Sequence, residues 1–240
     1  MTPECKSIVI EEITAFLDRF FAVDRFPASE RGGIYLPSPC SVRRLGLALE
    51  PGIQLQKWAS TQSLDTLFLH RPWKLEAGLL PADIGVISYH LPFDECLTMG
   101  YNTRLAQVLS MSDLEVLGEK ENRPIGMIGK IPTQSFGCLC NSVTQVFGGQ
   151  EQVLAAIHTD VTQIAVVGAN TDALVREAAA RGADVYITGQ FRQPALEAMR
   201  ETKIEAIAIG HRRSEAWGLR TLAGLLQERW SSLEVIVFPE

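Results

Sequence analysis

Several histidines and carboxylates stand where they could bind a divalent metal. His70, His90 and His211 each directly follow an apolar run that is typical of a buried β-strand. Asp94 lies four residues after His90, and Glu215 lies four residues after His211. Neutral imidazole and carboxylate groups are ligands that suit zinc, iron, manganese and nickel. The pattern therefore predicts a metal site that contains these residues.

Each of these residues also has an ordinary structural interpretation. A single histidine at a strand end is more often a hydrogen-bonding turn residue, and a single acid in the first turn of a helix complements the helix dipole. The two carboxylates could instead form ion pairs with arginines, for which the candidates are Arg71, Arg212 and Arg213. The joint pattern of three strand-end histidines, two of them followed by an acid, favours the metal site. The remaining histidine, His158, stands in a segment that we interpret as helical, and we expect it to be structural or on the surface.

The elements around these residues alternate between apolar strands and helical patterns. An amphipathic helix is predicted near the N-terminus, with one face formed by Val9, Ile13, Phe16, Leu17 and Phe20. The predicted strands are 42–49, 64–69, 84–89, 164–167, 185–188, 204–209 and 235–238, and the other predicted helices are 51–62, 100–109, 171–181, 194–202 and 214–226. This alternation indicates an α/β fold with mostly parallel sheets covered by helices. Ligands bind beyond the carboxyl ends of the strands in such sheets, which is where the histidines stand.

The chain is long enough to form two lobes. Residues 122–150 carry Pro, Gly, Ser and Cys in a less regular pattern, and we interpret this segment as the junction. We therefore predict an N-terminal α/β lobe over 1–125 and a C-terminal α/β lobe over 126–240, with an approximate boundary and with lobes that could interleave.

Composition and charge exclude several classes of protein. The net charge of -6 gives no global electrostatic reason to bind nucleic acid or anionic membranes. No apolar run approaches the roughly 20 residues that a membrane helix needs, and the N-terminus lacks the features of a signal peptide. Five cysteines at irregular spacing argue against a disulfide framework. We expect a soluble, cytoplasmic protein with neither nucleic acid nor membrane as a partner.

Four motifs in the chain are TLFLHRPW (66–73), YHLPFDECLTMGYNTRLAQVL (89–109), VVGANTDALVREAAARGADVYITGQ (166–190) and AIGHRRSEAWGLRTLAGLL (208–226). In order and spacing they resemble the Nif-three-like dinuclear metal-centre hexamer family, also called GTP cyclohydrolase 1 type 2 homologs. The resemblance implies a two-lobed protomer of Nif-three-like fold, a homohexameric toroid and paired metals in a cavity. By position it implies His70, Asp94, His211 and Glu215 as metal ligands, with His90 as a further candidate.

The chain departs from the family pattern at two places. Arg71 stands where the family has the second histidine of a His-His pair, and arginine stays protonated and cannot ligate a metal. Its fixed positive charge would also repel a nearby divalent ion, so we expect one metal per chain or weakened binding of a second. As an alternative, Arg71 pairs with Asp94 or Glu215 where the second metal would sit. In residues 189–194, glutamine and arginine replace an acid and a histidine that are common in the family.

Two functions follow from the residues and the resemblance. The first is a metal-dependent hydrolase that acts on a small nucleotide-like or phosphorylated substrate, with Glu215 or Asp94 as the catalytic residue that orients a water. The second is a non-catalytic metal-handling or scaffold protein that keeps the hexameric toroid. The altered site around Arg71 favours the second function, and the complete His, Asp and Glu set favours the first.

Overall fold

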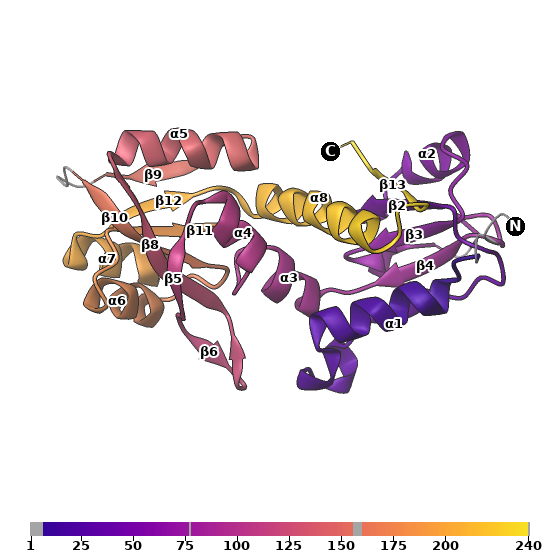
Figure 1. The fold of residues 1–240 in the computed structure, drawn as a ribbon, viewed down its shortest axis with the longest axis horizontal. Coiled ribbons are helices and arrows are strands. Elements are labelled where there is room, and N and C mark those ends of the chain that lie inside the picture. The colour runs from indigo at the N-terminus through magenta and orange to yellow at the C-terminus, as the bar shows by residue number, and fades with distance from the viewer. Residues whose placement is uncertain (1–6, 77, 156–159, 240) are drawn as a thin grey trace, which may run out of the picture. The chain divides into compact units, whose positions relative to one another are not determined.

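The computed structural model describes residues 7–76, 78–155 and 160–239 of the chain (Figure 1). The chain forms two compact units, which are residues 1–93 with 219–240 (unit 1) and residues 94–218 (unit 2). The chain passes from one unit to the other within two helices, α3 (Leu91–Leu97) and α8 (His211–Arg229). Residues 219–240 belong to unit 1, because the C-terminal strand joins the sheet of that unit. Residue 125, the approximate boundary predicted from the sequence, lies within unit 2.

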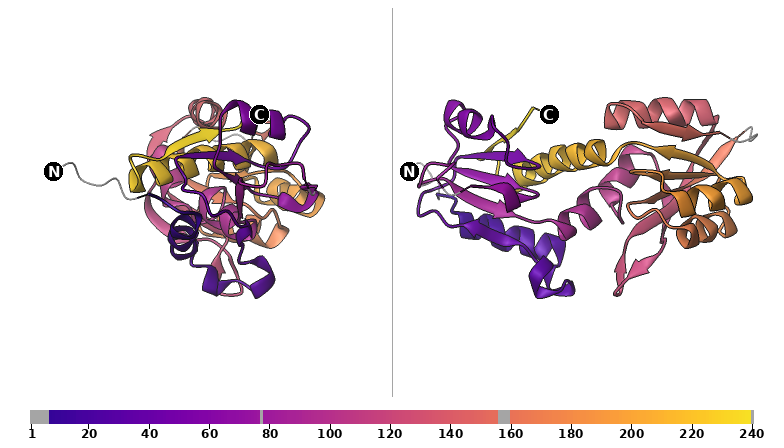
Figure 2. Two further views of the ribbon diagram at one scale, coloured as in Figure 1. Left: turned by 90° about the vertical axis from the view of Figure 1, so that its right-hand side faces the viewer. Right: turned by 180° about the vertical axis from the view of Figure 1, so that it is seen from behind.

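Unit 1 is built around a five-stranded sheet with the order β1-β4-β3-β2-β13. Its strands are β1 (Gly33–Leu36), β2 (Arg44–Ala48), β3 (Thr66–Leu69), β4 (Gly85–Ser88) and β13 (Glu234–Val237). Four of them are parallel, and β1 is added antiparallel to β4 at the edge. Helices α1 (Ile10–Phe21) and α2 (Leu55–Thr61) lie on opposite sides of this sheet (Figures 1 and 2). Short 3-10 helices are η1 (Val23–Arg25), η2 (Ala28–Glu30) and η3 (Pro72–Lys74).

Unit 2 contains a six-stranded sheet with the order β5-β8-β10-β11-β12-β9. Its strands are β5 (Ser112–Val116), β8 (Gly126–Gln134), β9 (Gln152–Leu154), β10 (Val161–Val167), β11 (Val185–Thr188) and β12 (Glu205–Ala208), and a small separate ladder joins β6 (Glu119–Lys120) to β7 (Arg123–Pro124). The central strands β10, β11 and β12 are parallel, and the other three are antiparallel to their neighbours.

Helices cover both faces of the second sheet. One hydrophobic cluster joins it to α4 (Thr103–Val108) and α5 (Phe136–Phe147), and another joins it to α6 (Asp172–Ala180) and α7 (Gln193–Thr202) (Figure 1). The predicted α/β class, with sheets covered by helices, is confirmed. The parallel strands are close to their predicted bounds, while the antiparallel strands β1, β5, β8 and β9 were not predicted.

The interpretation of residues 122–150 as a junction is wrong. This segment contains all of β8, which lies inside the second sheet, and all of α5. Its serine and glycine residues mark the ends of α5, because Ser135 accepts a hydrogen bond from the amide of Cys138 and Gly148 adopts a left-handed conformation. The helix expected around His158 is also wrong where the structure describes it, since residues 152–154 form β9. His158 itself lies outside the described residues.

Within the described residues, no helix combines the length and the apolar character needed to cross a membrane.

Tyr89, which follows β4, forms hydrogen bonds with residues of α1. We expect its hydroxyl to contribute measurably to the free energy of unfolding. The side chain is fully buried, and its hydroxyl lies 2.6 Å from Oδ1 of Asp18 and 3.2 Å from the carbonyl oxygen of Thr14. Burial raises the pKa of Tyr89 well above its usual value, so the hydroxyl remains a donor. Tyr89→Phe should lower the free energy of unfolding by about 1–3 kcal/mol, measured by urea denaturation, because it leaves two acceptors without this donor. Tyr35→Phe, at an exposed position, should change it by less than about 0.5 kcal/mol. Equal effects of the two variants would contradict this assignment.

Candidate metal centre

Two neighbouring parallel strands bring His70 and His90 together. His70 directly follows β3, and His90 follows β4 after Tyr89. Because β3 and β4 are parallel neighbours, their carboxyl ends meet at one edge of the sheet. The two imidazole ring centroids are 5.0 Å apart. The positions of His70 and His90 at neighbouring strand ends thus bring their side chains together.

Asp94 completes this cluster. One ligand atom each from His70, His90 and Asp94 can be chosen so that all three lie within 4.8 Å of one another. Asp94 lies in α3, about one helical turn after His90, and Pro92 is in the first turn of the same helix. Proline is tolerated in the first turn of a helix, where its missing amide hydrogen has no intrahelical acceptor. The spacing of four residues between His90 and Asp94 therefore corresponds to about one turn of helix.

The surroundings of His70 fix the orientation of its ring and leave one ring nitrogen able to bind a metal. The side chain is fully buried, and Nδ1 lies 3.1 Å from the carbonyl oxygen of Tyr89. A carbonyl can only accept, so Nδ1 carries the hydrogen, and in the neutral ring the lone pair is then on Nε2. Nε2 is also buried. Metal-binding histidines usually have their second nitrogen held by a carbonyl or carboxylate in this way, so the residues fit a divalent metal.

His90 is more accessible than His70. Its side chain is 36% exposed, and Nδ1 lies 3.8 Å from Oε2 of Glu30. The ring of Trp73 meets the His90 ring edge to face, with centroids 5.0 Å apart. Glu30 was not predicted as a site residue, because a single acid in a short 3-10 turn gives no motif or periodic signal. His90 was ranked below the other ligand candidates, yet it belongs to the group that the structure assembles.

Arg71 places a positive charge next to His70 in the chain. Its Nη2 lies 3.4 Å from Oε1 of Glu50, and its side chain is 18% exposed. The amide of Arg71 donates to the carbonyl of Leu49, which holds the segment after β3 against the end of β2. The structure therefore gives Arg71 a carboxylate partner within unit 1, and this partner was not among the predicted ones.

The imidazole of His211 and the carboxylate of Glu215 lie within hydrogen-bonding distance of each other in unit 2. Nε2 of His211 lies 3.0 Å from Oε1 of Glu215, with the acid buried and the histidine 64% exposed. Helix α8 begins at His211, so these two positions, four residues apart, share one helical face. Ser214, where the predicted helix 214–226 begins, lies inside α8 and its hydroxyl donates to the carbonyl of His211. That this pair shares one site with His70 and Asp94 stays a prediction.

Comparison with known proteins gives matches to one protein family over nearly the whole chain. The family model described as Duf34/NIF3 (NGG1p interacting factor 3) matches residues 8–240. A GTP cyclohydrolase 1 type 2 homolog from Pyrococcus horikoshii is 26% identical over 242 residues, which cover 95% of this chain and 96% of the relative. One from Yersinia pestis is 29% identical over 240 residues, which cover 91% and 93% respectively.

Solved structures share the fold. A Bacillus cereus protein related to NIF3 has a TM-score of 0.77 at 15% identity and covers 98% of both chains. The structure titled reduced HcgD from Methanocaldococcus jannaschii has a TM-score of 0.75 at 20% identity and covers 99% of this chain and 100% of that one. At these identities the likeness shows the arrangement of the backbone and not the chemistry.

Proposed function

Because the chain belongs to the Duf34/NIF3 family, we propose that it binds a divalent metal through His70, His90 and Asp94 and hydrolyses a small nucleotide-like or phosphorylated substrate. The observation that carries the proposal is the convergence of two imidazoles and one carboxylate within 4.8 Å. This ligand set suits zinc, iron, manganese and nickel. The names of the relatives, which are GTP cyclohydrolase 1 type 2 homologs, support a nucleotide-like substrate.

A bound metal would supply a Lewis acid that polarises an oxygen of the substrate. The protein's own residues have distinct roles around it. His70 is held in one orientation by the carbonyl of Tyr89, so its ligand nitrogen needs no rearrangement. Asp94 supplies negative charge, and Asp94 or Glu215 would accept a proton from the attacking water and orient it. His211 would keep the Glu215 carboxylate in place through the contact between its Nε2 and Oε1 of Glu215.

A second function is favoured by Arg71. Its positive charge follows His70 directly, where the family has a second histidine, and this arrangement suits a protein that holds one metal without turnover. In that version the chain handles metal or serves as a scaffold. For both versions we propose a homohexamer in the cytoplasm, with a small molecule as the partner of the enzyme version.

Replacing Glu215 tests the hydrolase. Metal-loaded protein would be assayed for phosphate release from GTP and from p-nitrophenyl phosphate. We expect Glu215→Gln to reduce turnover by about 100-fold or more, because removal of a positioned general base typically costs that much. Glu201→Gln, which changes an exposed carboxylate of the same unit, serves as the matched control and should leave turnover unchanged. Unchanged turnover in Glu215→Gln would remove this residue from the mechanism, and tight metal binding without any turnover in the wild type would favour metal handling.

A further inference from the structure

A buried arginine of unit 2 binds the residue next to Asp94. The side chain of Arg123 is 3% exposed, and its guanidinium contacts two carboxylates. Nε and Nη2 lie 2.9 Å and 3.4 Å from the two carboxylate oxygens of Glu95, and Nη1 lies 2.8 Å from Oε2 of Glu121. A planar guanidinium that bonds to both oxygens of one carboxylate also fixes its orientation. Arg123 therefore joins β7 to α3, the helix that contains Asp94.

A short hairpin presents Arg123 to this helix. Strands β6 and β7 are antiparallel, with Lys120 opposite Arg123, and a loop of two residues joins them. Both loop residues, Glu121 and Asn122, have positive φ angles, of 51° and 60°, as a type I′ hairpin turn requires. Asparagine tolerates this conformation well, whereas glutamate has no such preference. The carboxylate of Glu121 is nevertheless useful in this turn, because it supplies one of the two negative charges that contact the buried guanidinium.

Helix α3 is also held by the segment that follows it. The hydroxyl of Thr98 donates to the carbonyl oxygen of Asp94 at 2.7 Å. The backbone at Gly100 approaches the carbonyl of Glu95 so closely that a Cβ atom at Gly100 would collide with its oxygen. These contacts are local in the chain, whereas Arg123 reaches Glu95 from 28 residues further along. Arg123 thus ties the middle of α3 to a separate part of unit 2.

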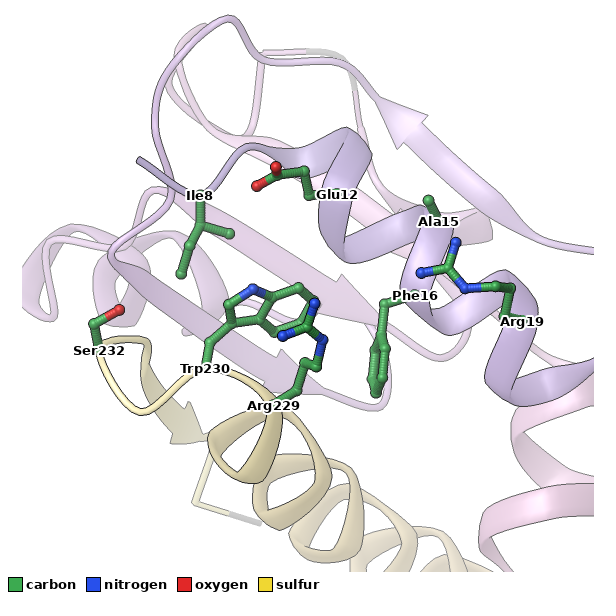
Figure 3. Close-up of a pocket in the computed structure, with 8 residues that line it drawn as sticks. All are labelled: Ile8, Glu12, Ala15, Phe16, Arg19, Arg229, Trp230 and Ser232. Carbon is green, nitrogen blue, oxygen red and sulfur yellow. The ribbon is translucent and has the colours of Figure 1, made fainter. Parts of the chain in front are cut away.

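Other arginines of the chain are placed differently. Arg19 and Arg229 are exposed and line a cavity of unit 1 between α1 and the turn after α8 (Figure 3). The guanidinium of Arg229 lies over the ring of Trp230, 5.1 Å from its centroid. Arg181 of unit 2 contacts two carboxylates, as Arg123 does, but its side chain is 30% exposed. Arg123 is instead buried, and a buried charge is costly unless the geometry of its ion pairs is well defined.

We propose that Arg123 is a positioning residue of the metal centre, which holds Glu95 and thereby fixes the neighbouring Asp94 through the backbone of α3. The inference rests on the proposed function, in which Asp94 binds the metal. Arg123 itself touches neither the metal nor the substrate in this scheme. Removal of its positive charge alone would tighten the binding of a cation, whereas loss of the position of Asp94 would weaken it. The sign of the change therefore separates positioning from electrostatics.

Calorimetric titration of zinc into metal-free, full-length protein tests the proposal. We expect Arg123→Ala to weaken zinc binding by about 10- to 100-fold, which is the usual cost of losing a residue that orients a metal ligand. Arg123→Lys keeps the charge but loses the planar fork, so it should weaken zinc binding to a smaller extent. Arg181→Ala is the matched control, because it removes an exposed arginine with two carboxylate partners from the same unit. It should bind zinc like the wild type.

Hydrogen exchange on the metal-free proteins gives a second readout. In Arg123→Ala the amides of residues 91–97 should exchange faster by about tenfold or more, because α3 opens locally more often without this contact. The amides of α6 and β11, in the same unit, should keep their wild-type rates. If the wild type bound no metal, the proposed function would fail, and exchange in α3 would still decide whether Arg123 holds this helix.

Three results would overturn the proposal. One is zinc binding by Arg123→Ala that is as tight as that of the wild type, or tighter. Another is unchanged exchange in residues 91–97 of this variant. The third is an equal acceleration of exchange throughout unit 2, which would mean that Arg123 supports the whole unit and has no particular effect on α3. If Arg123→Ala does not fold, the same three criteria apply to Arg123→Lys.

Discussion

Replacing His70 with glutamine should remove the bound metal almost completely. His70 is the most buried member of the group, and its ring is held by the carbonyl of Tyr89 at the end of the neighbouring strand. Glutamine fills similar space but offers a poor ligand, so the two remaining groups, His90 and Asp94, would have to hold the ion alone. Loss of a residue that only supports a ligand already costs about 10- to 100-fold in metal affinity, so we expect a dissociation constant at least about 100-fold higher.

The measurement is metal content by mass spectrometry after dialysis, together with calorimetric titration of zinc and manganese into metal-free protein. Circular dichroism and the midpoint of urea unfolding show whether the variant is folded. His211→Gln is the informative companion, because this histidine is exposed and was predicted as a ligand of the same site. Loss of metal in both variants would place His211 at the site, and loss only in His70→Gln would restrict the site to His70, His90 and Asp94. Full metal content in His70→Gln would exclude the proposed centre.

The strands that support this centre could be predicted because they are parallel and buried on both faces. Such strands are continuous apolar runs, as in β3 and β4, and their ends are marked where a polar residue follows. The edge strand β1 carries no such signal, because its apolar residues are exposed and its run is short. Strand β8 was missed since its polar residues and glycines suggested a loop. Sequence patterns thus identified the parallel strands of each sheet better than the antiparallel ones.

The site was predictable to the extent that its geometry is local. The spacing of His90 and Asp94 follows from one turn of helix, and the position of His70 follows from the end of a strand. Glu30 could not be identified in the same way, because it precedes β1 and meets His90 only after β1 has added to β4 in the antiparallel direction. No pattern of nearby residues records that pairing. Long-range pairing at a sheet edge therefore determines where Glu30 lies relative to His90.

Replacing Arg71 with histidine should increase the metal content by about one equivalent per chain. The change removes a fixed positive charge and introduces a neutral imidazole beside His70, where the family has the second histidine of its pair. Repulsion between a guanidinium and a divalent ion a few ångströms apart is large in a partly buried site, because little solvent screens it. Removal of this charge alone should therefore tighten binding of the first metal by about tenfold or more.

Arg71→Gln separates the two contributions, since it removes the charge and adds no imidazole. This variant should bind the first metal more tightly than the wild type at unchanged stoichiometry, whereas Arg71→His should also gain a second ion. Glu50 loses its ion-pair partner in both variants. Any effect of the freed carboxylate is therefore the same in Arg71→Gln and Arg71→His, and it cancels when these two variants are compared with each other. If the wild type and both variants bound the same number of metal ions with the same affinity, the guanidinium of Arg71 would be too far from the metal to affect its binding. A second equivalent in Arg71→His alone would mean that a single substitution separates a one-metal site from the two-metal site that the family pattern implies.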